Sequence, residues 1–248
     1  IGTGLVGSEM CIRDRSAAAL VLGMAGTAQA GTLEDVRDRG VLRCVVSTGI
    51  AGFAQPDANG VWGGFDIDFC RATAAAVLGD ASKIEAVTST GKTRFTKLNA
   101  GEGDVLWRNT TITFSRDVSV KLRFHGVNYY DGQGFMVKKD LGVSSASELD
   151  GASVCIQTGT TTELNLADYF SSNNMNYEPV PIETNDEARQ NYEAGRCDVY
   201  TTDASGLAST RSALPNPDDH MVLPEIISKE PLGPATRHGD DPVSYTHL

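Results

Sequence analysis

The order of apolar and polar positions in the first half of the chain predicts strands that alternate with helices. A β-branched apolar run over 41–46 is typical of a buried strand. Apolar residues recur at helical spacing over 66–78, and Gly79 follows where such a helix would end. Shorter runs predict a strand over 84–87, a helix over 93–100 and the start of a strand over 104–106.

The second half of the chain repeats this rhythm. Its predicted elements are strands over 135–137, 153–156 and 198–201, an extended segment over 177–180, and helices over 161–171, 186–194 and 204–212. Strands and helices of these lengths in alternation predict an α/β fold in which parallel-rich sheets are covered by helices. The proline-rich stretch 215–234 breaks the alternation, and we interpret it as irregular chain that leaves a second lobe.

The chain length sets the number of folding units. A length of 248 residues allows two lobes of about a hundred residues each. The segment 128–134 is a candidate first crossing between them, and a chain that crosses twice builds a hinge and a cleft. We therefore expect lobe 1 over 31–131, lobe 2 over 132–230, and a return toward lobe 1 over 231–241.

Composition and charge narrow the function classes. Hydrophobic residues make up 40% and charged residues 21% of the chain, as in soluble globular proteins. The formal net charge of −11 at pH 7 disfavours binding to nucleic-acid phosphates and to anionic membrane surfaces. His125, His220, His238 and His247 show no metal-ligand spacing, so we expect no metal and no cofactor.

The first thirty residues indicate export. An apolar run over 17–25 precedes Thr27-Ala28-Gln29-Ala30, which resembles a signal-peptide cleavage site with the cut after Ala30. A short membrane anchor is the alternative, but the run is about half of the ~20 residues that span a bilayer. We therefore expect a cleaved signal peptide and a periplasmic protein.

Both extreme ends of the chain look foreign. The stretches GSEMCIRDR over 7–15 and VSYTHL over 243–248 resemble translated sequencing-adapter read-through. On this interpretation, 1–30 is a signal-peptide remnant with an artefactual N-terminus and 242–248 is an artefactual tail. We expect the natural gene to continue beyond about residue 241, which makes the present chain truncated at its C-terminal end.

The cysteines divide between the two expected lobes. With Cys11 set aside, Cys44 and Cys70 fall in the first lobe, and Cys155 and Cys197 fall in the second. No CxxC spacing is present, which disfavours a zinc site and a thioredoxin-like redox motif. In an oxidising compartment we favour one bridge per lobe, Cys44–Cys70 and Cys155–Cys197, with four buried free thiols as the alternative.

Several motifs resemble the type 2 periplasmic amino-acid-binding proteins of ABC importers. They are GFDID at 64–68, NTTITFSR at 109–116, QTGTTTE at 157–163 and GRCDVYTTD at 195–203. Further stretches resemble the general L-amino-acid-binding subfamily: YYDGQGF at 129–135, ELNLADYF at 163–170 and PEIISKEPLGP at 224–234. Trp107 departs from the small residue expected there, and its bulk beside Arg108 and Asn109 would narrow the pocket or alter loop packing.

The resemblance implies how the chain functions. Members capture free L-amino acids, here with broad specificity, by hinge closure and deliver them to permease subunits in the inner membrane. We expect a monomer without enzyme activity. The alternatives are a periplasmic cyclohexadienyl dehydratase on the same fold, with Glu163 as the candidate general acid, and a receptor sensor domain.

A free amino acid carries a carboxylate and an ammonium on one carbon, and the motifs offer a partner for each. By resemblance, Arg116 clamps the α-carboxylate through two parallel hydrogen bonds, together with Asn109 and Thr111. A surface Arg116 paired with Asp117 is the alternative. Lys92 and Arg94 are expected on a solvated helix face.

The second lobe is expected to add the remaining ligand contacts. Thr160 and Thr161 open a helix whose free N–H groups attract an anion, and Thr161 offers a hydroxyl donor, although Thr160 with Glu163 is also an ordinary capping box. Asp203 would accept hydrogen bonds from the α-ammonium, or else cap the next helix. Phe53 is expected against the ligand's carbon chain, with a core contact as the alternative.

Overall fold

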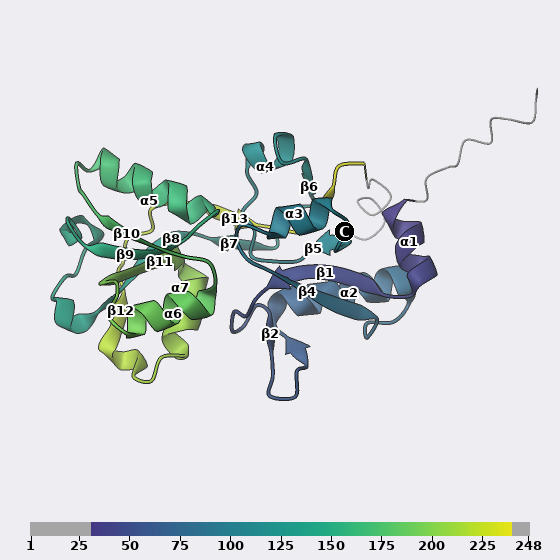
Figure 1. Ribbon diagram of the computed structural model, residues 1–248, viewed down its shortest axis with the longest axis horizontal. Helices are drawn as coiled ribbons and strands as arrows, with labels where there is room; N and C mark the ends of the chain where they lie inside the picture. Colours follow the sequence, from purple (N-terminus) through teal and green to yellow (C-terminus); the bar gives the residue numbers. More distant parts are fainter. Residues whose placement is uncertain (1–30, 240–248) are drawn as a thin grey trace, which may run out of the picture. The chain divides into compact units, whose positions relative to one another are not determined.

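Buried strands form the centres of two five-stranded sheets within residues 31–239, the part of the chain that the computed structural model describes. Each sheet belongs to one lobe, as predicted, and helices cover it (Figure 1). The predicted signal peptide with its cut after Ala30, Cys11 and the expected tail over 242–248 lie outside this range. Within the described residues, no helix is long and apolar enough to cross a membrane.

The first lobe contains a mixed sheet with strand order β4-β1-β5-β14-β6. These strands are β4 (Ile84–Ser89), β1 (Leu42–Ser47), β5 (Val105–Leu106), β14 (Ala235–Arg237) and β6 (Leu122–Phe124). β1 pairs in parallel with β4 and β5, whereas β14 is antiparallel to β5 and β6. The chain therefore returns from the second lobe to place a strand inside the first sheet.

Helices lie on both faces of this sheet because alternate residues of a strand point in opposite directions. Cys44 and Val46 of β1 pack with α1 (Thr32–Arg39) and α2 (Phe65–Leu78), whereas Val45 packs with Leu98 of α3 (Arg94–Asn99). The helix α2 ends at Gly79, whose φ of 73° is left-handed, as the sequence predicted. The remaining first-lobe elements are α4 (Phe114–Val118), β2 (Gln55–Pro56) and β3 (Trp62–Gly63).

The second lobe repeats the arrangement with strand order β10-β9-β11-β8-β12. The strands are β10 (Glu178–Ile182), β9 (Ser153–Gln157), β11 (Val199–Asp203), β8 (Gln133–Lys138) and β12 (His220–Val222). The helices are α5 (Thr161–Ser172), α6 (Asn185–Glu193) and α7 (Ala204–Ser212), with 3-10 turns η1 (Lys139–Leu141), η2 (Ala146–Glu148) and η3 (Pro217–Asp219). Phe135 and Val137 face α5, and Met136 between them faces α6 and α7.

Two antiparallel strands carry the chain between the lobes. β7 (Tyr129–Asp131) pairs with β13 (Glu230–Leu232), and Asp131 lies opposite Glu230 in the register. The interpretation of 215–234 as irregular was wrong in part, because β12 and β13 both lie in it. Each has three residues, which is too short to show a strand's alternation of apolar and polar positions.

Each lobe contains one disulfide in its core. Cys44 on β1 is bonded to Cys70 on α2, and Cys155 on β9 is bonded to Cys197 just before β11. This is the pairing that the division of cysteines between the lobes favoured. All four residues are at most 1% exposed.

Loss of the second-lobe disulfide is expected to lower the free energy of unfolding. The bridge Cys155–Cys197 closes 42 residues, and the loop-entropy relation assigns about 4 kcal/mol to a loop of that length. Cys155→Ala/Cys197→Ala should therefore shift the urea midpoint of the protein downward. An unchanged midpoint in this double variant and in reduced wild type would contradict the expectation.

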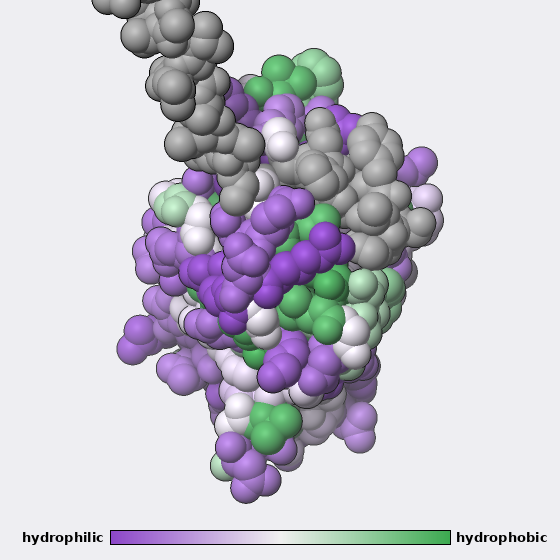
Figure 2. All heavy atoms as spheres, turned by 90° about the vertical axis from the view of Figure 1, so that its right-hand side faces the viewer, coloured by the Kyte–Doolittle hydropathy of each residue, from purple (hydrophilic) through white to green (hydrophobic). Residues whose placement is uncertain are grey.

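The molecular surface on the side of α1 is mostly hydrophilic. On the face that carries α1, hydrophilic side chains predominate and a smaller group of hydrophobic side chains lies among them (Figure 2). With a formal net charge of −11, such a surface opposes contact with polyanions.

Candidate functional site

A polar cavity lies where segments from both lobes follow the carboxyl ends of their strands. It is lined by Arg94, Arg108, Asn109, Thr111, Gln157, Thr160, Thr161, Thr162, Thr202 and Asp203. In α/β proteins, ligands bind at this end of the strands because side chains from several strands converge there. The cavity holds about 20 Å³, which is room for roughly one water molecule.

Three arginines are buried at this site. Arg94, Arg108 and Arg116 are 2%, 4% and 6% exposed, and all three come from the first lobe. Burial lowers the pKa of Arg108 and Arg116 to about 10, so both remain protonated at neutral pH. Buried cations cost free energy unless an anion or an acceptor compensates them. This concentration of positive charge therefore favours an anionic ligand group.

Arg94 lies at the start of α3 and was predicted on a solvated helix face, which is wrong. Its Nη1 donates to the Asn109 carbonyl at 3.4 Å and to the Thr110 hydroxyl at 3.3 Å, and its guanidinium lies 4.7 Å from the centroid of the Phe95 ring. Burial is the largest cause that lowers the pKa of Arg94. Lys92 does lie at the exposed surface, where Nζ is 3.4 Å from Glu183 Oε1.

Arg108 faces the cavity with an acidic neighbour behind it. Burial raises the pKa of Asp66 to about 7, although the Arg108 charge and a hydrogen bond from the Asn109 backbone oppose the rise. Asp66 Oδ2 and Arg108 Nε are both buried without a hydrogen-bond partner in residues 31–239. Asp66 thus supplies a negative charge close to Arg108, while the Arg108 Nε–H still lacks an acceptor within the described residues.

Arg116 packs close to the cavity rather than lining it. Its Nη1 donates to the Thr111 carbonyl at 2.6 Å, and its guanidinium lies 5.2 Å from the centroid of the Phe95 ring. The surface alternative, a pair with Asp117, does not apply to a residue that is 6% exposed. The backbone N–H of Arg116 donates to the Thr113 hydroxyl, which caps the N-terminus of α4, the helix that carries Arg116.

Asp203 ends β11 on the second-lobe side of the cavity. It is 5% exposed, and Oδ1 has no hydrogen-bond partner within the described residues. Burial, with Asp131 and Glu230 nearby, raises the pKa of Asp203 to about 7, while Arg94 and Arg116 oppose the rise. The side chain makes no capping hydrogen bond to α7. The predicted alternative, an ordinary helix cap, is therefore not what the structure shows.

Thr160 and Thr161 have different surroundings. Thr160 caps α5: its hydroxyl donates to the Gln157 carbonyl at 2.6 Å and accepts from the Glu163 N–H at 3.2 Å. Glu163 in turn accepts from the Gly159 N–H at 2.8 Å, so this pair has the capping role that the sequence offered as one interpretation. The Thr161 hydroxyl instead points to Thr111 and Glu230.

Glu230 is a buried site residue that the sequence analysis missed. It lies at the start of β13 and is 2% exposed. Its carboxylate accepts hydrogen bonds from Thr111 and Thr161, which both line the cavity, and also from Asn165 and Ser228. A glutamate in a proline-rich stretch has no sequence signal that distinguishes it from a surface residue.

Phe53 lies outside the cavity lining. Phe53 packs at ring-centroid distances of 5.9 Å against Phe65 and against Tyr129, in a cluster with Ile50 and Leu232. This is the core contact given as the alternative for Phe53.

Trp107, the departure from the family pattern, turns away from the cavity lining. Its ring stacks on Phe69 at 4.9 Å, and Nε1 donates to the Thr73 hydroxyl at 3.1 Å, so it packs on α2. Asn109, in contrast, lines the cavity and has a buried Oδ1 without a partner in the described range.

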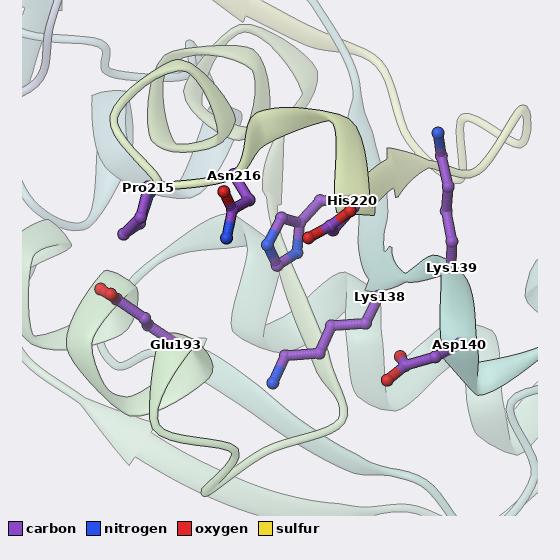
Figure 3. A pocket seen from close by; sticks show the side chains of 8 residues that line it. Lys138, Lys139, Asp140, Glu193, Pro215, Asn216 and His220 are labelled. Atoms are coloured by element: carbon purple, nitrogen blue, oxygen red, sulfur yellow. The ribbon is translucent and has the colours of Figure 1, made fainter.

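A larger cavity of about 530 Å³ lies at the opposite end of β8, within the second lobe alone (Figure 3). His220 and Lys138, cross-strand neighbours, line it with Glu193 and Asn216. Its lining contains both acidic and basic side chains. The Tyr192 hydroxyl is hydrogen-bonded to His220 Nδ1 at 2.9 Å. Among the described residues, no group of three or more His, Cys, Asp or Glu could hold a metal ion. Unlike the smaller cavity, it lies in one lobe and contains no buried arginine.

Two α/β lobes, joined by two crossing strands and sharing a polar site with buried charges, define the class of two-lobe solute-binding proteins. The profile of the bacterial extracellular solute-binding proteins, family 3, matches residues 42–191, and the chain belongs to this family.

Named relatives agree with the family. The chain is 63% identical over 223 residues to the glutamate/glutamine/aspartate/asparagine-binding protein of Rhodobacter capsulatus. The aligned region covers 90% of this chain and 66% of the relative. It is 59% identical to the general L-amino acid-binding periplasmic protein of Rhizobium johnstonii, over 91% of this chain and 66% of the relative. The chain thus spans slightly less than two thirds of the length of these relatives.

A solved structure shows the same fold. It is an ABC transporter/periplasmic binding protein from Brucella ovis with glutathione bound, with a TM-score of 0.84 and 55% sequence identity. The match covers 88% of this chain and 70% of that one.

Proposed function

We propose that this chain is the substrate-binding subunit of an ABC importer and captures free L-amino acids with broad specificity in the cleft between its lobes. It delivers them to permease subunits in the inner membrane, acts in the periplasm after export, and functions as a monomer without catalysing a reaction. The observation that carries the proposal is the buried Asp203 carboxylate, whose Oδ1 has no hydrogen-bond partner within the described residues, across the cavity from buried arginines.

The charges of the site match those of an amino acid. Arg116 supplies a planar fork for the α-carboxylate. Asn109 and Thr111, from the same lobe, line the cavity with further polar groups for the ligand. Asp203 supplies an acceptor for the α-ammonium, so the ligand would satisfy an oxygen that otherwise lacks a partner. Arg94 and Arg108 add two further cations, which suit a ligand with a second anionic group.

The size of the cavity supports a hinge mechanism. About 20 Å³ is far too little for an amino acid, so the ligand enters only if the lobes separate or the lining shifts. The paired strands β7 and β13 are the connection about which such a movement would occur. Second-lobe contacts to the ligand, from Thr161 and Asp203, form only after closure, and they bias the equilibrium toward the closed state.

The relatives support the ligand class. Two of them are named as binding proteins for L-amino acids, one for the acidic residues and their amides. The Brucella structure holds glutathione, a γ-glutamyl peptide with a free α-amino acid end. A site with one ammonium acceptor and several cations fits ligands of this kind.

The second interpretation, a cyclohexadienyl dehydratase, requires a general acid in the cleft. Its candidate, Glu163, accepts a hydrogen bond from the Gly159 N–H in the cap of α5 and does not line the cavity. We therefore propose a binding role.

A thermal-shift panel tests this function. The purified protein is heated with each of the twenty amino acids, glutathione, prephenate and arogenate. A ligand at a hundred times its dissociation constant adds about 2.7 kcal/mol of stability, which raises the melting temperature by several degrees. We expect shifts with several L-amino acids. Shifts with prephenate or arogenate alone would support the enzyme, and no shift at all would contradict the ligand class.

A further inference from the structure

The Glu230 carboxylate receives four side-chain hydrogen bonds, two on each oxygen. Oε1 accepts from the Asn165 amide at 2.7 Å and from the Ser228 hydroxyl at 2.7 Å. Oε2 accepts from the hydroxyls of Thr111 at 2.5 Å and Thr161 at 3.0 Å. With 2% of its surface exposed, the side chain has little access to water.

A carboxylate accepts hydrogen bonds and donates none, so it determines where these hydroxyl protons point. Each threonine hydroxyl has one proton, and Glu230 Oε2 takes both. The two threonine oxygens lie 3.2 Å apart, with Thr111 in the first lobe and Thr161 on α5 in the second. With both protons turned to Glu230, neither oxygen has a proton left to donate to the other or to a ligand.

We propose that Glu230 is a positioning residue that makes Thr111 and Thr161 hydrogen-bond acceptors toward the cleft, and so selects ligands with an ammonium group. The inference rests on the proposed function, because it assigns a partner to the ammonium of the same ligand. Together with Asp203, which also lines the cavity, the two oxygens provide acceptors from both lobes. This replaces the sequence-based expectation that Thr161 donates to the ligand.

The arrangement also couples ammonium binding to lobe contact. Two oxygens 3.2 Å apart with no proton between them repel each other through their lone pairs. An ammonium has three N–H donors, so it can bind both oxygens and remove the repulsion. A hydroxyl group at the same carbon has a single proton and cannot satisfy both oxygens and Asp203. Discrimination between amine and hydroxyl ligands is the property to measure.

Glu230→Gln tests the proposal because it keeps the shape and reverses the polarity of one atom. Asn165 needs an acceptor, so the glutamine oxygen should take the Oε1 position and the amide NH₂ the Oε2 position. The NH₂ group would then donate to both threonine oxygens, and their protons would turn toward the cleft. The matched control is Glu225→Gln, a glutamate five positions earlier in the chain whose carboxylate accepts from the Ala146 N–H and does not line the cavity.

The readout is the ratio of dissociation constants for an amino acid and its 2-hydroxy acid, measured by titration calorimetry. The pairs are L-glutamate with 2-hydroxyglutarate and L-alanine with L-lactate. In Glu230→Gln we expect the preference for the amine to fall by ~10-fold or more, the scale of a hydrogen bond to a charged group. Glu225→Gln should keep the wild-type ratio.

The outcomes separate this inference from the proposed function. An unchanged ratio in a folded Glu230→Gln protein overturns the role of Glu230, whereas wild type that binds no amino acid overturns the proposed function itself. If Glu230→Gln does not fold, Thr161→Val serves instead, since it removes the oxygen and keeps the shape. A lower amine preference in Thr161→Val supports the acceptor role, and equal losses for both ligands contradict it.

Discussion

Asp203→Asn is expected to weaken amino-acid binding by about 2–5 kcal/mol, the range for loss of one partner from a buried charge pair. The α-ammonium would face a neutral amide whose NH₂ group repels it, in a site with little water. The measurement is the dissociation constant for L-amino acids at pH 8, with Asp198→Asn, at the far end of the same strand region, as the control. Equal affinities in wild type and Asp203→Asn would contradict the assignment.

The same substitution should stabilise the ligand-free protein. The pKa of Asp203 is about 7 in the folded state, above its ordinary value of 3.8, so the folded protein holds this proton more tightly than the unfolded chain. The group therefore opposes folding fully above pH 7, and the penalty disappears as the pH falls from about 7 to about 4. A rise of that size corresponds to up to about 4 kcal/mol.

Asparagine carries no charge to desolvate, so Asp203→Asn removes this penalty. We expect its free energy of unfolding at pH 8 to exceed that of the wild type, and the difference to vanish near pH 4. Asp66, whose pKa is also raised to about 7, titrates in both proteins and cancels in the difference. Urea titrations of both proteins at several pH values measure this difference in the free energy of unfolding. A variant less stable than wild type at pH 8 would show that Asp203 is satisfied in the folded protein.

Arg116→Ala is expected to cost about 2–5 kcal/mol of binding for every amino acid, because it leaves a desolvated α-carboxylate unpaired. The loss should not depend on the ligand's side chain, since all amino acids share the carboxylate. Arg71→Ala is the control: Arg71 lies outside the cleft and pairs with Asp68 at 3.1 Å. Calorimetric titration with several amino acids provides the comparison.

Unchanged affinity in Arg116→Ala would refute the clamp. In that case the arginines that line the cavity directly, Arg94 and Arg108, are the next candidates. Arg94→Met would then show the uniform loss expected of a clamp. An effect limited to acidic amino acids would instead place the arginine at the ligand's side chain.

The sequence predicted those parts of the fold that rest on local patterns. The strand over 41–46 and the helix over 66–78 appear as β1 and α2 within one residue of their expected ends, because burial on two faces and a glycine cap leave clear signals. The pairing of Cys44 with Cys70 followed from their place in one lobe. The strand β14 left no such signal, since it is three residues long and its partners are far away in sequence.

The site was harder to predict because its chemistry depends on burial. Arg94 at the start of a short amphipathic helix has the sequence pattern of a surface residue, and only the contact with Thr110 and the Phe95 ring shows otherwise. Glu230 acquires its role from four hydrogen bonds to residues up to 119 positions away. The effect of Trp107 on the pocket likewise depends on the orientation of its side chain. The ring packs on α2 and does not line the cavity.

One free amino acid is expected to bind between the lobes of one chain. Calorimetric titration of protein refolded from denaturant, and thus free of carried-over ligand, tests it most directly. The amino acid with the largest thermal shift should bind with a stoichiometry of one per chain, and Arg116→Ala and Asp203→Asn, from opposite lobes, should each weaken it. Binding that survives both substitutions, or no binding to refolded wild type, would contradict the account.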